Sequence, residues 1–114
     1  MSAAPRPAPP GSPTIHEAER APGTSGAVLR GAEIDLGRAV ARRQAELDVV
    51  VCGDDTDANR RLAQQIEGAV GPYIVQHFHG KAGPLALPHV QQQTAPPEGH
   101  TFYETNRRKS RKRP

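Results

Sequence analysis

The sequence has 114 residues, which predicts a single domain, and its 12 prolines and 11 glycines against 4% aromatic residues predict a small core of modest stability. The formal net charge of +3 is unevenly spread, because six positive charges fall within residues 107–113 and leave −3 (+3 less 6) on the rest of the chain. This asymmetry favours an interaction tail over a basic enzyme groove.

Cysteine content and hydropathy exclude further classes of protein. The single cysteine, Cys52, excludes an intramolecular disulfide. No apolar stretch approaches the roughly 18 residues of a membrane span, and residues 1–11 lack the apolar core of a secretory signal. We therefore expect a soluble, cytoplasmic protein that makes no membrane contact.

The first part of the chain divides into a leader and a helix. Residues 1–26 contain six prolines among small and polar residues, so they predict a disordered leader. Residues 27–47 predict a first helix, because Asp35 is a suitable N-cap and apolar residues follow it at helical spacing.

A strand and a second helix form the clearest pattern. In residues 47–53, LDVVVCG, three valines and a cysteine form an unbroken apolar run, ended by Gly53, that predicts a strand covered on both faces. The segment DDTDANRRLAQQIEGAVGP predicts a helix with an apolar stripe, with Thr56 or Asp57 as its N-cap and an end at Gly71 and Pro72.

Three extended segments follow the second helix, at residues 73–79, 85–93 and 100–105. Pro88 is expected to place the middle segment at an edge of the sheet. The predicted fold class is therefore α+β, with two helices on a small mixed sheet of about four strands. We expect this domain to span residues 27–105, between the disordered leader and a disordered basic tail.

Two histidines near the end of the chain are candidate catalytic residues. His89 and His100 lie on segments that can pair as neighbouring strands, and imidazoles titrate near neutrality, so the two are suited to act as general base and acid in RNA cleavage. Lys81, Tyr103 or Glu104 would then orient the reacting group. The alternative is that both histidines are edge residues hydrogen-bonded to loop carbonyls.

Carboxylates follow the apolar strand directly and are candidate metal ligands. Asp54 and Asp55 lie where hydrolytic enzymes often hold a divalent metal ion. A calcium loop is excluded, because Arg60 and Ile66 stand where it needs glycine and glutamate. The alternative is that Asp54, Asp55 and Asp57 serve helix capping and compensation of the helix dipole.

A second metal hypothesis rests on the sequence HFH. His77 and His79 would point to one face of a strand. A zinc ion would need further ligands, for which His89 and His100 are available, but no Cys-x-x-Cys or His-Glu-x-x-His motif accompanies them. The pattern therefore indicates a structural zinc site only weakly.

The tail at residues 106–114 is strongly basic. Its cations would attract phosphate groups without reading sequence, and they are Arg107, Arg108, Lys109, Arg111, Lys112 and Arg113. No aromatic RNA-binding strand motif accompanies them. The alternative is a solvated, disordered terminus.

Two segments, DVVVCGDDTDANRRLAQQIEGAVGP and AGPLALPHVQQQTAPPEGHTFYET, resemble the short C-terminal modules of bacterial Rhs-type and related polymorphic toxins. The resemblance covers residues 38–105. It implies an effector module, most often a nuclease, that is delivered into a target cell as part of a larger protein and is neutralised by a cognate immunity protein. No Rhs repeat precedes the module, and no Asp…Glu-x-Lys nuclease signature is complete.

The leading hypothesis is a toxin-like effector module that cleaves phosphodiester bonds with His89 and His100 as acid and base. Asp54 and Asp55, holding a divalent metal ion, provide the alternative chemistry. Two other functions stay open: a non-catalytic protein that binds nucleic acid or an acidic partner through its basic tail, and an inactive remnant of a larger Rhs-type protein.

Overall fold

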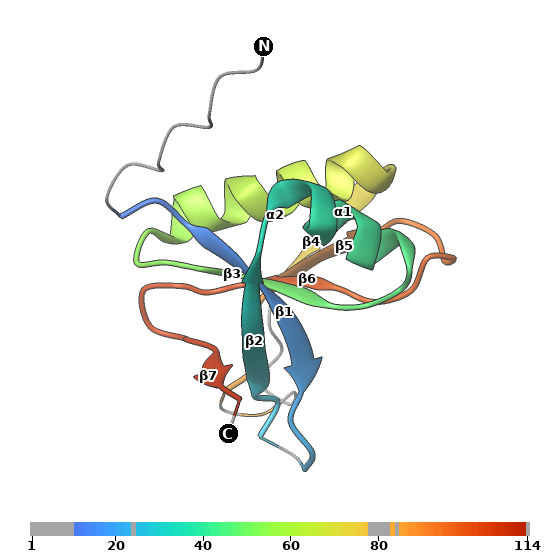
Figure 1. Ribbon diagram of the computed structural model, residues 1–114. Coiled ribbons are helices and arrows are strands. Elements are labelled where there is room, and N and C mark those ends of the chain that lie inside the picture. Colours follow the sequence, from blue (N-terminus) through green and yellow to red (C-terminus); the bar gives the residue numbers. More distant parts are fainter. Residues whose placement is uncertain (1–10, 24, 78–82, 84, 114) are drawn as a thin grey trace.

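Two helices lie on one face of a twisted, mixed sheet (Figure 1). The computed structural model describes residues 11–23, 25–77, 83 and 85–113. Within these residues the elements are β1 Thr14–Arg20, β2 Val28–Ile34, α1 Leu36–Gln44, β3 Val49–Cys52, α2 Thr56–Val70, β4 Tyr73–Gln76, β5 His89–Gln92, β6 Thr101–Tyr103 and β7 Arg111–Lys112. The strand order is β4-β5-β6-β3-β1-β2-β7. The α+β class is thus confirmed.

Strand β3 is the centre of the sheet, as its apolar sequence predicts. All four of its residues are buried. It runs parallel to β6, with Val50 opposite Phe102, and antiparallel to β1. Because alternate side chains of a strand point to opposite faces, Val49 and Val51 pack in the cluster under the helices, whereas Val50 and Cys52 pack in a second cluster on the open face.

Both helices begin at aspartate caps. Asp35 caps α1, as predicted, and its carboxylate accepts a hydrogen bond from the backbone N–H of Arg38. The cap of α2 is Asp55 rather than Thr56 or Asp57, because the Asp55 carboxylate accepts from two free N–H groups of the first turn. Neither helix in the described part of the chain is long and apolar enough to cross a membrane.

The prediction of about four strands is wrong, because two strands lie in segments that were assigned otherwise. Strand β1 occupies residues predicted to be a disordered leader, and β2 occupies the first part of the predicted helix at 27–47. The two strands form an antiparallel hairpin, which β1 joins to β3. Ile15 and Ala18 are the only buried side chains of β1, so its local apolar signal is weak.

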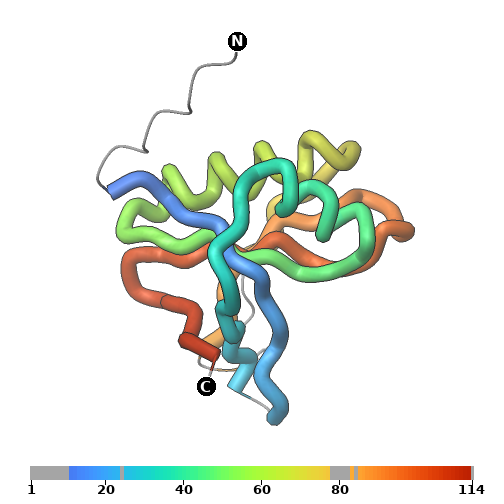
Figure 2. The backbone as a smooth tube through the Cα atoms, viewed as in Figure 1, coloured from blue at the N-terminus to red at the C-terminus, as the bar shows by residue number. Residues whose placement is uncertain are grey.

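The positions of two further segments also differ from the prediction. Strand β5 lies between β4 and β6 rather than at an edge, since Pro88 precedes its first paired residue and removes no ladder hydrogen bond. The C-terminal segment, predicted to be disordered, includes β7, which pairs with β2 at Leu29 and Arg30. Figure 2 shows this red segment beside the teal trace of β2.

A buried ion pair joins the two helices to the sheet. Arg43 of α1 and Glu67 of α2 are both fully buried, with Arg43 Nε 2.9 Å from Glu67 Oε2. Thr101 of β6 donates its hydroxyl to Glu67 Oε2, and the Gln92 amide of β5 donates to the Glu67 carbonyl. Arg43 also donates to the carbonyls of Leu47 and Glu98. The charges are therefore desolvated but fully hydrogen-bonded.

We expect Arg43→Met to lower the free energy of unfolding by about 3–5 kcal/mol, because it leaves the Glu67 carboxylate buried without a counter-charge. The double variant Arg43→Met/Glu67→Met should be more stable than the single variant, since neither charge then remains. Urea denaturation measures both. Arg60→Met, which breaks the exposed pair with Asp57, is the control and should change stability by less than about 1 kcal/mol. Equal effects of Arg43→Met and Arg60→Met would contradict the burial of the pair.

Candidate functional site

The two predicted catalytic histidines lie together on the open face of the sheet. His89 begins β5 and is paired with Phe102 of β6, and His100 immediately precedes β6. Their ring centroids are 4.5 Å apart in an edge-on arrangement. Both rings also contact Phe102, with centroid distances of 5.7 and 5.3 Å. The antiparallel pairing of β5 and β6 thus brings together two residues that are eleven positions apart in the sequence.

Two residues that the sequence analysis missed complete this cluster. Arg20, the last residue of β1, places its Nη2 atom 2.7 Å from His100 Nδ1 and its guanidinium carbon 5.8 Å from the centre of the Phe102 ring. The Asp48 carboxylate accepts a hydrogen bond from the His100 backbone N–H at 2.8 Å. Neither had a local signal, because Arg20 lies in the segment assigned to the leader and Asp48 is a single acid before β3.

The two imidazoles have different hydrogen-bond partners. His89 Nε2 is 2.8 Å from Gln91 Oε1, a pure acceptor, so Nε2 carries the proton and Nδ1 is left unprotonated. His100 lies between a donor and an acceptor: Arg20 Nη2 is 2.7 Å from its Nδ1 and 3.1 Å from its Nε2, and Asp48 Oδ1 is 3.6 Å from Nδ1. His89 Nδ1 is therefore the free proton acceptor of the pair.

Burial and charge set the ionisation of this cluster. The pKa of His89 is lowered to about 4. Burial is the largest cause, and the positive charges of His100 and Arg20 lower this pKa by more than the Gln91 hydrogen bond raises it. Burial opposes the ionisation of Asp48, but hydrogen bonds from His100 and the charges of His100 and Arg20 hold the pKa of Asp48 below its usual value. At neutral pH the site therefore contains a neutral His89 and a charged Asp48.

Tyr103 and Glu104, the other two predicted catalytic residues, do not join the histidines. Tyr103 points to the helix side and packs in the core with Ile66 and Val90, and burial raises the pKa of its hydroxyl. Glu104 is buried beyond the far end of β6. Tyr103 points to the opposite face of the sheet because side chains alternate along a strand. Glu104 follows the end of β6 that is farther from His100.

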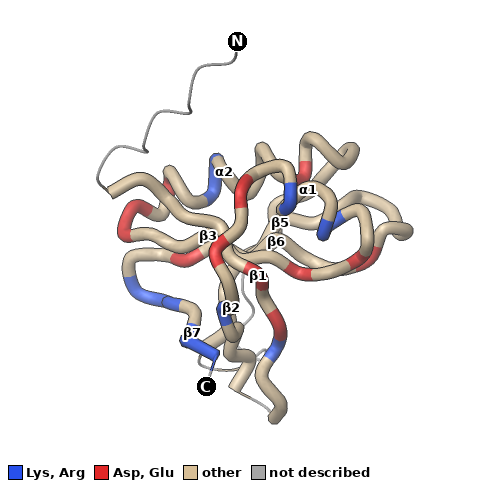
Figure 3. Tube along the Cα trace, viewed as in Figure 1, with Lys and Arg blue, Asp and Glu red and all other residues tan. Residues whose placement is uncertain are grey.

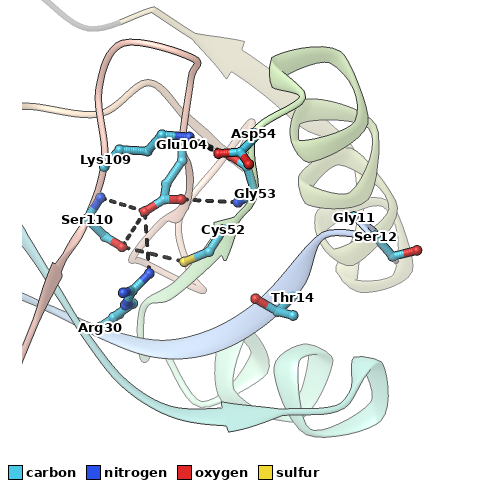
Figure 4. A pocket seen from close by; sticks show the side chains of 10 residues that line it. All are labelled: Gly11, Ser12, Thr14, Arg30, Cys52, Gly53, Asp54, Glu104, Lys109 and Ser110. Carbon is cyan, nitrogen blue, oxygen red and sulfur yellow. Dashed lines mark hydrogen bonds and ion pairs between the residues drawn. The ribbon is translucent and has the colours of Figure 1, made fainter. Parts of the chain in front are cut away.

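Glu104 lies in a second polar pocket of about 430 Å³, which Figure 4 shows. Its carboxylate accepts hydrogen bonds from the backbone N–H of Gly53 and from both the N–H and the hydroxyl of Ser110. Cys52 Sγ is 3.5 Å from Ser110 Oγ, and burial raises the pKa of the Cys52 thiol, which disfavours the nucleophilic thiolate. The contacts indicate that this pocket anchors the C-terminal segment.

The predicted metal ligands are engaged in other interactions. Asp55 caps α2, and the exposed Asp54 carboxylate is 3.2 Å from Lys109 Nζ. Within the described residues no three His, Cys, Asp or Glu side chains gather in a way that could hold a metal ion. His77 is exposed, while His79 and Lys81 lie outside the described residues.

The cations of the C-terminal segment divide into two groups. Figure 3 shows basic residues gathered along the segment that forms β7. Lys109 pairs with Asp54, Arg113 pairs with Glu19, and Arg108 donates to the Ala86 carbonyl. The side chains of Arg107, Arg111 and Lys112 are exposed and have no ion-pair partner in the described part of the chain. Half of the predicted phosphate-binding cations therefore remain available.

Comparison of the chain with protein-family models, with curated proteins and with solved structures finds no match. Within the described residues, the His89–His100 cluster combines a neutral imidazole that can accept a proton, a second imidazole, a guanidinium and a charged carboxylate. Such a set can move protons to and from a substrate while it holds an anionic group.

We expect stability to fall as the pH falls from 7 to 5, in part because of His89. Its pKa is about 4 in the folded protein against 6.5 ordinarily, so the unfolded chain binds the proton more tightly and the stabilisation is lost as pH falls through this window. Urea denaturation at pH 7 and pH 5 should give a smaller difference for His89→Gln than for the native protein. The exposed His77→Gln is the control, and equal differences for all three proteins would contradict the burial of His89.

Proposed function

We propose that this protein is an RNA-cleaving effector module in which His89 and His100 are the catalytic base and acid. The observation that carries the proposal is the contact of these two histidines, one in β5 and one directly before β6, beside the guanidinium of Arg20. A pair of half-buried imidazoles contributes little to a core that is otherwise apolar on this face. Their arrangement is better explained by proton transfer at a shared substrate.

The chemistry gives each ring one role. His89 Nδ1 removes the proton from a ribose 2′-hydroxyl, whose oxygen attacks the adjacent phosphorus. The bond from phosphorus to the 5′-oxygen breaks, and His100, which enters the step as an imidazolium, donates a proton to that oxygen and becomes neutral. The products are a 2′,3′-cyclic phosphate and a free 5′-hydroxyl, and the step requires no metal ion. DNA, which lacks the 2′-hydroxyl, is not cleaved by this route.

Arg20 and Asp48 both lie near Nδ1 of His100 and support this step. The guanidinium of Arg20 has five N–H donors, so it retains donors for a phosphate oxygen while it contacts His100. Asp48 fixes the backbone of His100 and places a negative charge 3.6 Å from Nδ1. That charge stabilises His100 as an imidazolium once it has taken up a proton again. A bound phosphodiester likewise raises the pKa of His89 towards the working pH.

The resemblance to Rhs-type toxin modules agrees with this proposal, because nucleases are common among such modules. On that basis we propose an effector that acts inside a target cell and is bound by an immunity protein. The basic C-terminal segment would increase the local concentration of RNA through its free cations, without choosing a sequence.

We expect His100→Ala and His89→Ala each to reduce cleavage of single-stranded RNA by about 10²- to 10⁴-fold, the usual contribution of a general acid or base. Gel analysis of end-labelled RNA measures cleavage, and growth after induced expression in bacteria measures toxicity. His77→Ala, which removes an exposed histidine outside the cluster, should retain full activity. Full activity of both cluster variants would remove the chemistry from this site.

The pH profile tests the role of His89 separately. In the free enzyme its pKa is about 4, so the acid limb of kcat/KM should fall well below pH 6.5, the ordinary value for histidine. Stopped-time assays between pH 4 and pH 8 measure this limb. A limb centred near pH 6.5 would show that the base is not a buried histidine.

A second candidate function is nucleic-acid binding without cleavage, and the exposed Arg111 and Lys112 favour it. The double variant Arg111→Gln/Lys112→Gln should weaken binding to all sequences equally and reduce the slope of log affinity against log salt by about 2. Substitution is a cleaner test than deletion of residues 106–114, because deletion removes Ser110 from the buried Glu104. The matched control is Arg38→Gln/Arg61→Gln on the helices, and equal effects of both pairs would exclude a binding role for β7.

A further inference from the structure

A threonine, a histidine and a backbone carbonyl form a hydrogen-bonded chain on the open face of the sheet. Thr14 Oγ1 is 2.9 Å from His16 Nε2, and His16 Nδ1 is 3.1 Å from the carbonyl oxygen of Gly31 in β2. The two side chains share a face because they are two positions apart on β1. A hydroxyl, a base and a group that orients the base are the parts of an activated nucleophile.

The hydrogen-bond partners fix the proton positions of this chain. A backbone carbonyl only accepts, so Nδ1 of His16 carries the proton that is donated to Gly31. In the neutral ring Nε2 then holds a lone pair, and the Thr14 hydroxyl donates to it. The hydroxyl proton of Thr14 is therefore already directed at a base whose ring is held by β2.

Thr14 lines the polar pocket of about 430 Å³ that also contains Glu104. This volume lies within the range of about 300–1,000 Å³ that small-molecule sites occupy. The contacts drawn as dashed lines in Figure 4 join Glu104 to the C-terminal segment through Ser110, and none of them involves Thr14. The Thr14 side of the pocket is thus not used to anchor the C-terminal segment.

Arg30 of β2 brings a positive charge to the same pocket. Its guanidinium interacts with the thiol of Cys52, the residue that is paired with Thr14 across β1 and β3. Side chains of paired residues are neighbours on one face of a sheet. The ion pair of Arg30 with Glu104 is 3.9 Å long and involves only Nη1, so N–H donors of the guanidinium remain for a ligand.

We propose that this pocket is a second catalytic site, which hydrolyses small carboxylic esters through an acyl-threonine intermediate. Thr14 is the nucleophile, His16 is its general base, and Arg30 stabilises the oxyanion. The proposal goes beyond RNA cleavage and does not depend on it, because the site shares no residue with the His89–His100 cluster.

The reaction has two balanced steps. Thr14 Oγ1 attacks the carbonyl carbon of the ester while its proton passes to His16 Nε2. The bond from that carbon to the alcohol oxygen breaks, and His16 returns the proton to the departing alcohol. In the second step a water molecule attacks the acyl group and gives its proton to His16, which passes it to Thr14 Oγ1 as the carboxylic acid leaves.

Reaction of the full chain with 4-nitrophenyl acetate tests the proposal. We expect a burst of 4-nitrophenolate equal in amount to the protein, followed by slower release, because the acyl intermediate accumulates. Peptide mapping by mass spectrometry after an acid quench should locate the acetyl group on Thr14. This location is measured in the native protein and depends on no variant. An acetyl group on Ser12 or Lys109, which line the same pocket, in place of Thr14 would overturn the proposal.

Variants then separate the nucleophile from its base. Thr14→Val should abolish the burst, whereas Thr14→Ser, which keeps the hydroxyl, should retain it. His16→Phe should slow acylation by about 10²- to 10⁴-fold, the usual contribution of a general base. Ser12→Ala is the matched control, since Ser12 lines the pocket without a hydrogen bond to a histidine among the described residues, and it should leave the burst unchanged. A native burst in Thr14→Val would overturn the proposal, and circular dichroism verifies that each variant is folded.

Discussion

The buried ion pair between Arg43 and Glu67 is the interaction on which the arrangement of the molecule depends. It joins α1 to α2, and its hydrogen bonds to Thr101 and Gln92 extend into β6 and β5. Such a pair stabilises a fold only when its remaining donors and acceptors are satisfied, and here the same hydrogen bonds that satisfy it also position the strands. The contact from Arg43 to the Glu98 carbonyl then fixes the loop before His100. The geometry of the candidate site is thus a consequence of how the core accommodates two charges.

The side chains of β6 have different roles on the two faces of the sheet. Thr101 and Tyr103 point to the helices and serve the core, whereas Phe102 lies on the open face under both imidazoles. At the far end of the strand, Glu104 holds the C-terminal segment through Ser110. A short strand therefore separates the histidine cluster from the site that anchors the C-terminal segment.

The partial burial of the histidine cluster has a chemical consequence. Burial keeps His89 neutral at neutral pH, whereas Arg20 is exposed and its contact with His100 is open to water. The same burial costs stability at acid pH, since His89 must remain uncharged in the folded protein.

The sequence by itself determined the elements whose patterns are local. The run of valines predicted β3, the apolar stripe predicted α2, and the two histidines were recognised by residue type and by their adjacent segments. Only the tertiary structure decided that β1 joins the sheet, that Arg20 meets His100, and that Glu104 turns away from the histidines to hold the tail. The reason is physical: hydrophobic period and capping depend on neighbours in the chain, whereas strand pairing and side-chain direction depend on partners many residues away.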